Sequence, residues 1–382
     1  MIKKSKFIRE LELVSTDKEF LEPFNVLIDS LNYEANLGSI GQIAVEYQLK
    51  QHINNRILID KAYSLKKHSV SKPLIVIGLP RSGTTFIHRY LAKNKVGNGS
   101  KLYQIIFTSA VLQKIIKPIL PFLEKISPAR FHSDEIHKTS LDSLETDDPS
   151  LLFRFFDGFF LYAFILTWAK EDLLDWFQPK VRDNSKRDFN WLQTMWKRTL
   201  ITSNSDRIIG KLFSISVNVP AFLNKFPDAK LLYMVRDPLN VIPSGLSLVT
   251  GVLDSMFGFW SFPVKKRQHF INRLYKALVE LQLRFHDDWM NGRIDKSKVA
   301  IIQFDRMMTD FEGLMDEVLP FIGHEPSNEF KNNIQETAKK QRAYKSGHKY
   351  DLSKFGITEN QIKEDCKVIY EEFLNQKVNI NV

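Results

Sequence analysis

The stretch 74–86 constrains the fold more than any other part of this chain. Its first four residues, 74–77, are apolar and mostly β-branched, which is typical of a strand buried on both faces of a parallel sheet. Gly78 and Gly83 then bracket a short loop, and the spacing beyond it predicts a helix beginning at Thr84. A strand, a glycine loop and a helix N-terminus direct backbone N–H groups at one point, so the stretch predicts an anion site. A plain glycine turn is the alternative.

The glycine spacing is that of a nucleotide-binding P-loop, Gly-x4-Gly, with one informative change. The lysine that follows the second glycine in NTPases is replaced by Thr84, which Thr85 follows. The cation lies inside the loop instead, as Arg81. Because the lysine–hydroxyl pair serves the β/γ-phosphates and Mg²⁺, its loss argues against ordinary ATP or GTP hydrolysis. Two hydroxyls, backbone amides and a guanidinium still suit a tetrahedral oxyanion.

Length and charge set the broad class. The 382 residues allow one large α/β domain or two smaller ones, and a net charge of +10 fits an anionic ligand or surface. No zinc-finger spacing or RNP-like strand points to nucleic acid as a partner. The one cysteine, Cys366, excludes internal disulfides and cysteine zinc sites and fits a reducing compartment. No apolar signal-peptide core follows the start, so we expect a cytoplasmic protein.

Further strands alternate with helices along the chain. Strand-like runs cover 207–211, 231–235 and 299–304, which predicts a parallel sheet with ligands at the carboxyl ends of its strands. Asp237 and Pro238 follow the second run as the N-cap and first residue of a helix.

We expect three parts. A helical lead-in, 1–70, packs on a P-loop domain, 71–382, in which a helical insertion at about 100–205 forms the acceptor side. The apolar stretch 105–126 is expected to be a helix broken by Pro118 and Pro121.

The apolar stretch 151–169 is long enough to cross a bilayer but contains two charges. Arg154 and Asp157 would each cost roughly 2.5–3.5 kcal/mol at mid-membrane, and at this spacing they can pair on one helix face. We therefore expect a buried helix at a pocket. Most of its aromatic rings are interpreted as core, and a few as lining for an acceptor.

A second anion site is predicted at the end of the 231–235 strand. Arg236 stands there, and Ser244 follows eight residues later, two turns along the next helix. A guanidinium in that place can clamp a phosphate in a charge-assisted pair, and the hydroxyl can close the other side.

These two sites resemble those of a known family. The residues 80–86 read Pro-Arg-Ser-Gly-Thr-Thr-Phe and resemble the 5′-phosphosulfate loop of sulfotransferases that use PAPS, 3′-phosphoadenosine 5′-phosphosulfate. Arg-Asp-Pro with a serine eight residues after the arginine resembles the 3′-phosphate site of that family. The resemblance extends over most of the chain and implies an α/β P-loop fold of three layers, with a central parallel sheet, a helical N-terminal lead-in and helical insertions.

The resemblance also implies roles for residues. The 5′-phosphosulfate would be held by Arg81, which also acts in catalysis, with Ser82, Gly83, Thr84 and Thr85, while Phe86 packs under the nucleotide. The 3′-phosphate would be held by Arg236 and Ser244. The segment 347–356 resembles a late loop of the family, so Lys345 and His348 are candidates to hold a phosphate, or else are solvated loop residues.

One family block survives only in part. In the pattern Leu-Lys-Ser-Pro-x-His only Lys211 carries over, because Leu212, Phe213 and Ile215 replace the serine, proline and histidine.

The general base is not fixed by the resemblance. The family often has Trp-Glu soon after the loop helix, whereas this chain has Tyr103 and Gln104, and a glutamine cannot take a proton. His137 and Glu145 match a downstream block and are the candidates, with His137 first; a capping or surface role is the alternative. His88, on the loop helix, is interpreted as structural.

The resemblance implies transfer of a sulfuryl group from PAPS to a hydroxyl or amine of a small-molecule acceptor, with no metal and no nucleic acid. We expect the acceptor to have an apolar part, as a lipid or phenolic has. Lys114, Lys117 and Lys125 fit an anionic membrane surface, so a peripheral membrane contact is a further interpretation. Two alternatives remain: a catalytically silent protein that binds 3′-phosphonucleotides, and a kinase with a divergent P-loop.

Overall fold

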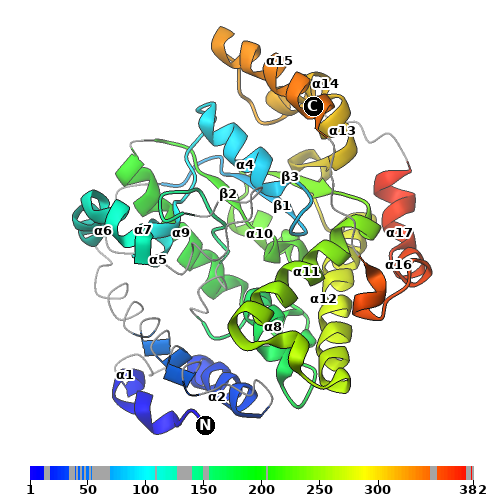
Figure 1. The fold of residues 1–382 in the computed structure, drawn as a ribbon. Helices are drawn as coiled ribbons and strands as arrows, with labels where there is room; N and C mark the ends of the chain where they lie inside the picture. The colour runs from blue at the N-terminus through cyan, green and yellow to red at the C-terminus, as the bar shows by residue number, and fades with distance from the viewer. Residues whose placement is uncertain are drawn as a thin grey trace. The chain divides into compact units, whose positions relative to one another are not determined.

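The structure is a computed structural model of the full chain (Figure 1). It describes residues 1–12, 18–33, 39, 42–43, 45–46, 49–50, 53, 69–107, 110–126, 140–148, 155–203, 205–344, 351–375 and 380. The chain forms two compact units. The helical unit comprises Met1–Ser69, Ser100–Asn204 and Leu248–Ala277, and the sheet unit comprises Val70–Gly99, Ser205–Ser247 and Leu278–Val382. The sequence-based division into a lead-in and a P-loop domain stays a proposal.

The sheet unit is built on four parallel strands in the order β2-β1-β3-β4. The strands are β1 (Leu74–Gly78), β2 (Ile209–Lys211), β3 (Lys230–Val235) and β4 (Val299–Gln303). The predicted α/β class and the predicted parallel sheet are confirmed. The last strand is one residue shorter than predicted, because Phe304 already begins a helix.

The order of the strands determines where a ligand can bind. β2 lies on one side of β1 and β3 lies on the other, so the chain reverses its direction of winding at β1. In open parallel sheets ligands bind outside the carboxyl ends of strands at such a point. Gly78, the last residue of β1, pairs with Met234 near the end of β3, so the segments that follow the two strands leave the sheet side by side.

Helices pack on the sheet around one apolar cluster. Helix α4 (Thr84–Lys93) begins at the residue predicted for it and contacts β1 and β2 (Figure 1). Its Ile87 and Leu91 are buried with Phe311, Leu314 and Phe330. The last three belong to α14 (Phe311–Phe321) and α15 (Asn328–Ala343).

The other elements of the sheet unit are short. They are η6 (Ser214–Val217), α10 (Val219–Lys225), η8 (Lys296–Lys298), α13 (Phe304–Thr309), η9 (Leu352–Phe355), α16 (Glu359–Asp365), α17 (Lys367–Ile369) and η10 (Tyr370–Leu374).

Two long helices contain residues of both units: α11 (Pro238–Phe257) and α12 (Val264–Met290), with η7 (Phe259–Ser261) between them. The predicted start of α11 is confirmed, because the Leu239 N–H donates to the Asp237 carboxylate at 2.9 Å. Pro243 lies inside the helix.

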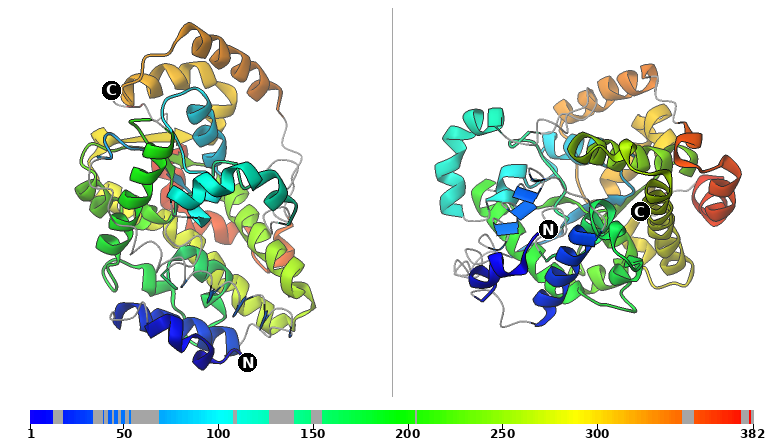
Figure 2. Two further views of the ribbon diagram at one scale, coloured as in Figure 1. Left: turned by 90° about the vertical axis from the view of Figure 1, so that its left-hand side faces the viewer. Right: turned by 60° about the horizontal axis from the view of Figure 1, so that its bottom comes forward.

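The described residues of the helical unit form helices and loops, with one isolated β-bridge between Lys101 and Leu144. Its elements are η1 (Lys4–Phe7), α1 (Ile8–Glu12), α2 (Lys18–Tyr33), α5 (Leu102–Ile106), α6 (Ala110–Ile116), η2 (Lys117–Ile119), α7 (Leu120–Ile126), α8 (Phe159–Phe164), η4 (Leu166–Trp168), η5 (Leu174–Phe177) and α9 (Ser185–Ser203). The predicted break in 105–126 is confirmed, because α6 ends at Ile116 and α7 begins at Leu120, with η2 between them (cyan in Figure 2).

The expectation of one buried helix over 151–169 is wrong for the part that the structure describes. Residues 149–154 lie outside the described residues, and α8 begins only at Phe159. The backbone before it contains Phe156 at φ 56° and Gly158 at φ 91°, left-handed conformations that a right-handed helix does not include. Among the described helices, none is long and apolar enough to cross a membrane.

Candidate functional site

The loop 79–83 leaves β1 with a shape that requires glycine at two places. Gly78 has φ +126°, and a Cβ there would come within 2.4 Å of the Met234 carbonyl oxygen. Gly83, the residue before α4, has φ +91°, and its Cβ would lie 2.7 Å from the Met307 methyl carbon. Between them the buried Ser82 hydroxyl donates to the Leu79 carbonyl at 2.7 Å and closes the turn. The loop therefore passes closer to its neighbours than a side chain at either glycine would allow.

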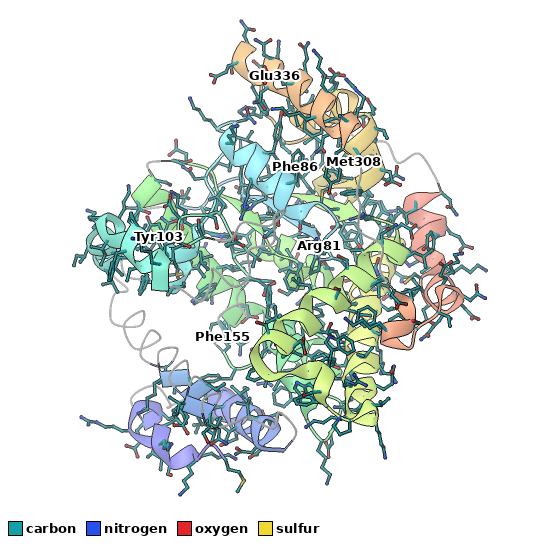
Figure 3. All side chains as sticks on the ribbon, viewed as in Figure 1. Arg81, Phe86, Tyr103, Phe155, Met308 and Glu336 are labelled. Atoms are coloured by element: carbon teal, nitrogen blue, oxygen red, sulfur yellow. The ribbon has the colours of Figure 1, made fainter. Side chains whose placement is uncertain are left out.

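Arg81 ties this loop to the segment after β3 (Figure 3 labels its position). Its φ of 73° is left-handed, a conformation that costs a non-glycine residue roughly 1–3 kcal/mol. Two contacts hold it there. The Arg81 Nε–H donates to the Ser244 hydroxyl at 3.1 Å, and the Arg81 carbonyl accepts from Arg236 Nη1 at 2.9 Å.

Arg236 is oriented by one further contact. Its guanidinium lies over the ring of Phe304, with the guanidinium carbon 4.1 Å from the ring centroid. The next residue, Asp237, accepts hydrogen bonds from Leu239 N and from the Tyr370 hydroxyl, at 2.9 and 2.6 Å. The structure thus brings together Arg81, Arg236 and Ser244, which the sequence assigned to two separate anion sites.

Lys211 brings a third cation to the same end of the sheet. It is the last residue of β2, it is buried, and its Nζ donates to the Thr85 hydroxyl at 3.0 Å. Thr85 belongs to the first turn of α4, where unpaired N–H groups and the helix dipole already favour a negative charge. The sequence analysis identifies Lys211 as the one residue of a family motif that this chain retains, but it does not predict its contact with Thr85. The pairing of β2 with β1 is what brings Lys211 to this end of the sheet.

The arrangement is suited to a ligand with more than one negative charge. Two guanidiniums, one ammonium, two hydroxyls and a helix N-terminus meet at the carboxyl ends of β1, β2 and β3. Charge-assisted hydrogen bonds from such groups to sulfate or phosphate oxygens are about twice as strong as neutral ones.

His88 supports the site from behind, as the structural interpretation expects. Its side chain is fully buried on α4, and its Nε2 lies 3.0 Å from the Ile209 carbonyl of β2, two residues before Lys211. Burial and, to a lesser extent, the charge of Lys211 lower the pKa of His88 to about 3. The neutral ring therefore donates to β2 and fixes the strand that carries Lys211 against α4.

We expect His88 to make the stability of the protein depend on pH. The folded pKa of about 3 lies below the unfolded value of 6.5, so the unfolded chain takes up the proton first. The stability that the neutral ring contributes is complete above pH 6.5 and is lost as the pH falls toward 3, by about 1.4 kcal/mol per pH unit. Urea unfolding at several pH values measures this slope.

His88→Gln is the matched variant, because its Nε2–H can still donate to Ile209 but does not titrate. Its free energy of unfolding should fall less steeply with acid than that of the parent. Parallel curves for the two proteins would show that His88 does not carry the dependence.

Comparison with known proteins identifies the family. The profile of the sulfotransferase family matches residues 73–328, which include Arg81, Lys211, Arg236 and Ser244. The chain belongs to the sulfotransferase family. No curated protein sequence matches it significantly.

Two solved sulfotransferases have the same fold. STF9 from Mycobacterium avium is 17% identical with a TM-score of 0.73, and the match covers 100% of this chain and 98% of that one. STF1 from Mycobacterium tuberculosis H37Rv is 16% identical with a TM-score of 0.68, and the match covers 95% of this chain and 98% of that one.

Phe86 of this sulfotransferase packs into the core. Its half-buried ring stacks on Tyr90 with centroids 5.7 Å apart and meets Phe311 edge-on at 5.8 Å (Figure 3). The contact with a nucleotide that the sequence implies for Phe86 stays a prediction.

Gln104 has a structural role in the helical unit. Its Oε1 accepts from the Lys101 N–H at 2.9 Å and caps α5, while its Nε2 donates to the Thr202 hydroxyl at 3.1 Å. The amide oxygen thus caps α5, and the amide nitrogen ties α5 to α9.

The candidate bases differ in what the structure says of them. Glu145 is buried and accepts from the Ser143 hydroxyl at 3.1 Å. His137 lies outside the described residues, as do Lys345 and His348. Their roles stay predictions of the sequence.

The aromatic stretch before α9 is mostly core. Its buried rings are Phe155, Phe156, Phe159, Tyr162 and Trp168, whereas Phe160 and Phe164 are half-buried.

Asp157 pairs with an arginine of α9 and also accepts a hydrogen bond from Asn184 at 3.2 Å. Arg187 donates to its two carboxylate oxygens at 2.9 and 3.0 Å. The expected partner, Arg154, lies outside the described residues.

Proposed function

We propose that this sulfotransferase moves the sulfuryl group of PAPS to a hydroxyl or amine of a small-molecule acceptor and releases 3′,5′-ADP. The observation that carries the proposal is the hydrogen-bonded set of Arg81, Arg236 and Ser244 beside the start of α4. An ordinary nucleoside triphosphate needs one anion site, whereas PAPS has anionic groups at both its 5′ and 3′ positions. Two neighbouring cations, one on the loop and one after β3, suit such a molecule.

The loop after β1 and the start of α4 would hold the 5′-phosphosulfate. The backbone of 82–85, the hydroxyls of Thr84 and Thr85, and the cations Arg81 and Lys211 are its proposed ligands. As the S–O bond to the phosphate breaks, negative charge develops on the bridging oxygen, and these fixed donors stabilise it. The proposal needs no metal, because positive charge is supplied by side chains and the P-loop lysine–hydroxyl pair that accompanies Mg²⁺ is missing.

The 3′-phosphate would be held by Arg236 and Ser244. The Ser244 oxygen accepts the Arg81 Nε–H, so the serine proposed for the 3′-phosphate also contacts the cation of the loop. One hydroxyl can therefore link the two subsites, and nucleotide binding at one would help to fix the cation at the other. Lys345 and His348 remain proposed as further phosphate contacts.

The proton of the acceptor needs a base, and we propose Glu145 or His137. Glu145 is a buried carboxylate that accepts the Ser143 hydroxyl, and a carboxylate or an imidazole can each serve as a general base.

We propose that the acceptor has a substantial apolar part. The helical unit, which contains Glu145, also carries the aromatic stretch, and the half-buried rings of Phe160 and Phe164 are its candidates for acceptor contacts. Pockets for small molecules are lined mostly by apolar and aromatic groups with a few placed polar ones.

Turnover of PAPS with a panel of acceptors tests this function. Release of 3′,5′-ADP is expected with phenols, long-chain alcohols or lipid alcohols, and excess EDTA should leave the rate unchanged. Sulfation of simple sugars with no activity on any hydrophobic alcohol would contradict the acceptor class. Loss of activity in EDTA with recovery on adding Mg²⁺ would instead favour the kinase alternative.

A further inference from the structure

The segment 110–126 of the helical unit presents apolar side chains to solvent. Ile115, Ile119 and Phe122 are 62%, 48% and 66% exposed. They lie within eight residues of one another, one on each of the consecutive elements α6, η2 and α7. Isolated exposed apolar residues are ordinary on a protein surface, but three so close together require an explanation.

Other side chains of this segment anchor it in the protein. Ile116 and Leu120 are buried with Leu102, Tyr103 and Leu141. The three exposed apolar residues do not belong to that buried cluster.

Three exposed lysines, Lys114, Lys117 and Lys125, stand among these apolar residues in the sequence. The only acidic residue in the segment, Glu124, accepts the Leu141 backbone N–H at 2.7 Å. We call the six residues Lys114, Ile115, Lys117, Ile119, Phe122 and Lys125 the lysine–apolar face.

We propose that the lysine–apolar face binds the surface of an anionic lipid bilayer. Apolar side chains with flanking lysines are typical of helices that lie in the membrane interface, where the apolar groups enter the headgroup–acyl boundary. Lysine is depleted at interfaces between proteins, so the three lysines favour a lipid surface over a protein partner. The proposal does not depend on the donor or the acceptor, but a bilayer is where a lipid alcohol would be met.

The expected binding has a clear dependence on charge. Each lysine near an anionic surface contributes about 1 kcal/mol, or about a fivefold change in partitioning. Added salt weakens the electrostatic contribution to binding because it screens exposed charges. The contribution of the apolar side chains to binding should persist in salt.

Sedimentation of the full chain with vesicles tests the proposal. Vesicles of equal parts phosphatidylserine and phosphatidylcholine should bind the protein, and vesicles of phosphatidylcholine alone should bind it far more weakly. The variant K114Q/K117Q/K125Q should bind the anionic vesicles about 100-fold more weakly, from three fivefold steps. The variant I115Q/I119Q/F122Q should bind the anionic vesicles at least tenfold more weakly than the parent.

Matched variants separate the face from general effects. K331Q/K339Q/K340Q removes three exposed lysines from α15, and V181Q/V264Q removes two exposed apolar side chains from elsewhere in the helical unit. Both should bind vesicles as the parent does. All variants change exposed side chains, so their unfolding temperatures should match the parent, and sulfation of a water-soluble acceptor should be unchanged.

Three outcomes would overturn the proposal. The first is that the parent fails to bind phosphatidylserine vesicles, and the second is equal losses in the face variants and the matched variants. The third is a dimer in sedimentation velocity that I115Q/I119Q/F122Q abolishes, which would assign the face to a second copy of the chain. Turnover of PAPS can succeed or fail independently of all three.

Discussion

Arg81→Ala is expected to lower the turnover of PAPS by at least 100-fold and to leave the fold intact. Removing one preorganised donor that stabilises developing charge costs about 10²–10³ in rate. Arg81 also forms hydrogen bonds with Ser244 and Arg236, so its loss disturbs the residues proposed for the 3′-phosphate as well. The side chain is half-buried in the loop 79–83, and Arg81 is not a member of the apolar core.

Two further variants make this result specific. Arg81→Lys keeps the charge but loses the planar Nε–H that contacts Ser244, so we expect a rate between those of the parent and the alanine variant. Lys93→Ala removes an exposed cation at the other end of α4 and should leave turnover unchanged. Turnover of Arg81→Ala within threefold of the parent would show that Arg81 does not hold the phosphosulfate.

Arg236→Ala is expected to weaken the binding of 3′,5′-ADP about 10- to 150-fold and the binding of 5′-AMP much less. A charge-assisted hydrogen bond is worth ~1.5–3 kcal/mol, and only the first nucleotide has a 3′-phosphate. Ser244→Ala should show the same preference with a smaller loss of about 3- to 10-fold, since its hydrogen bond is made by a neutral hydroxyl.

Calorimetry with both nucleotides measures the difference between them, which is the informative quantity. Arg236 also contacts the Arg81 carbonyl, so some loss for both ligands is expected from a disturbed loop. Ser247→Ala, an exposed site three residues further along α11, is the matched control and should bind both nucleotides normally. Equal losses of the two nucleotides in Arg236→Ala would place the 3′-phosphate elsewhere.

The sequence predicts the local parts of this site well. Short apolar runs gave the strands, and the glycine spacing gave the start of α4 at Thr84, because these features depend on neighbours in the chain. Asp237 and Pro238 likewise predicted the start of α11 from capping alone.

Contacts between distant residues were not predicted. Arg81 and Ser244 are 163 positions apart, and Lys211 and Thr85 are 126 apart, so each pair depends on the order and register of the strands. The helix expected over 151–169 failed for a different reason. Apolar content indicates burial, but it does not reveal that Phe156 and Gly158 take left-handed conformations.

The central claim is that the site binds a nucleotide with a 3′-phosphate. Thermal unfolding of the full chain with 3′,5′-ADP in excess EDTA, or with ATP and Mg²⁺, tests it most directly, because a ligand that binds only the folded state raises the unfolding temperature. Stabilisation by 3′,5′-ADP without metal and little by ATP with Mg²⁺ is expected. If the same protein then failed to consume PAPS with any acceptor, it would be the catalytically silent binding protein. Stabilisation by ATP with Mg²⁺ and none by 3′,5′-ADP would contradict the account.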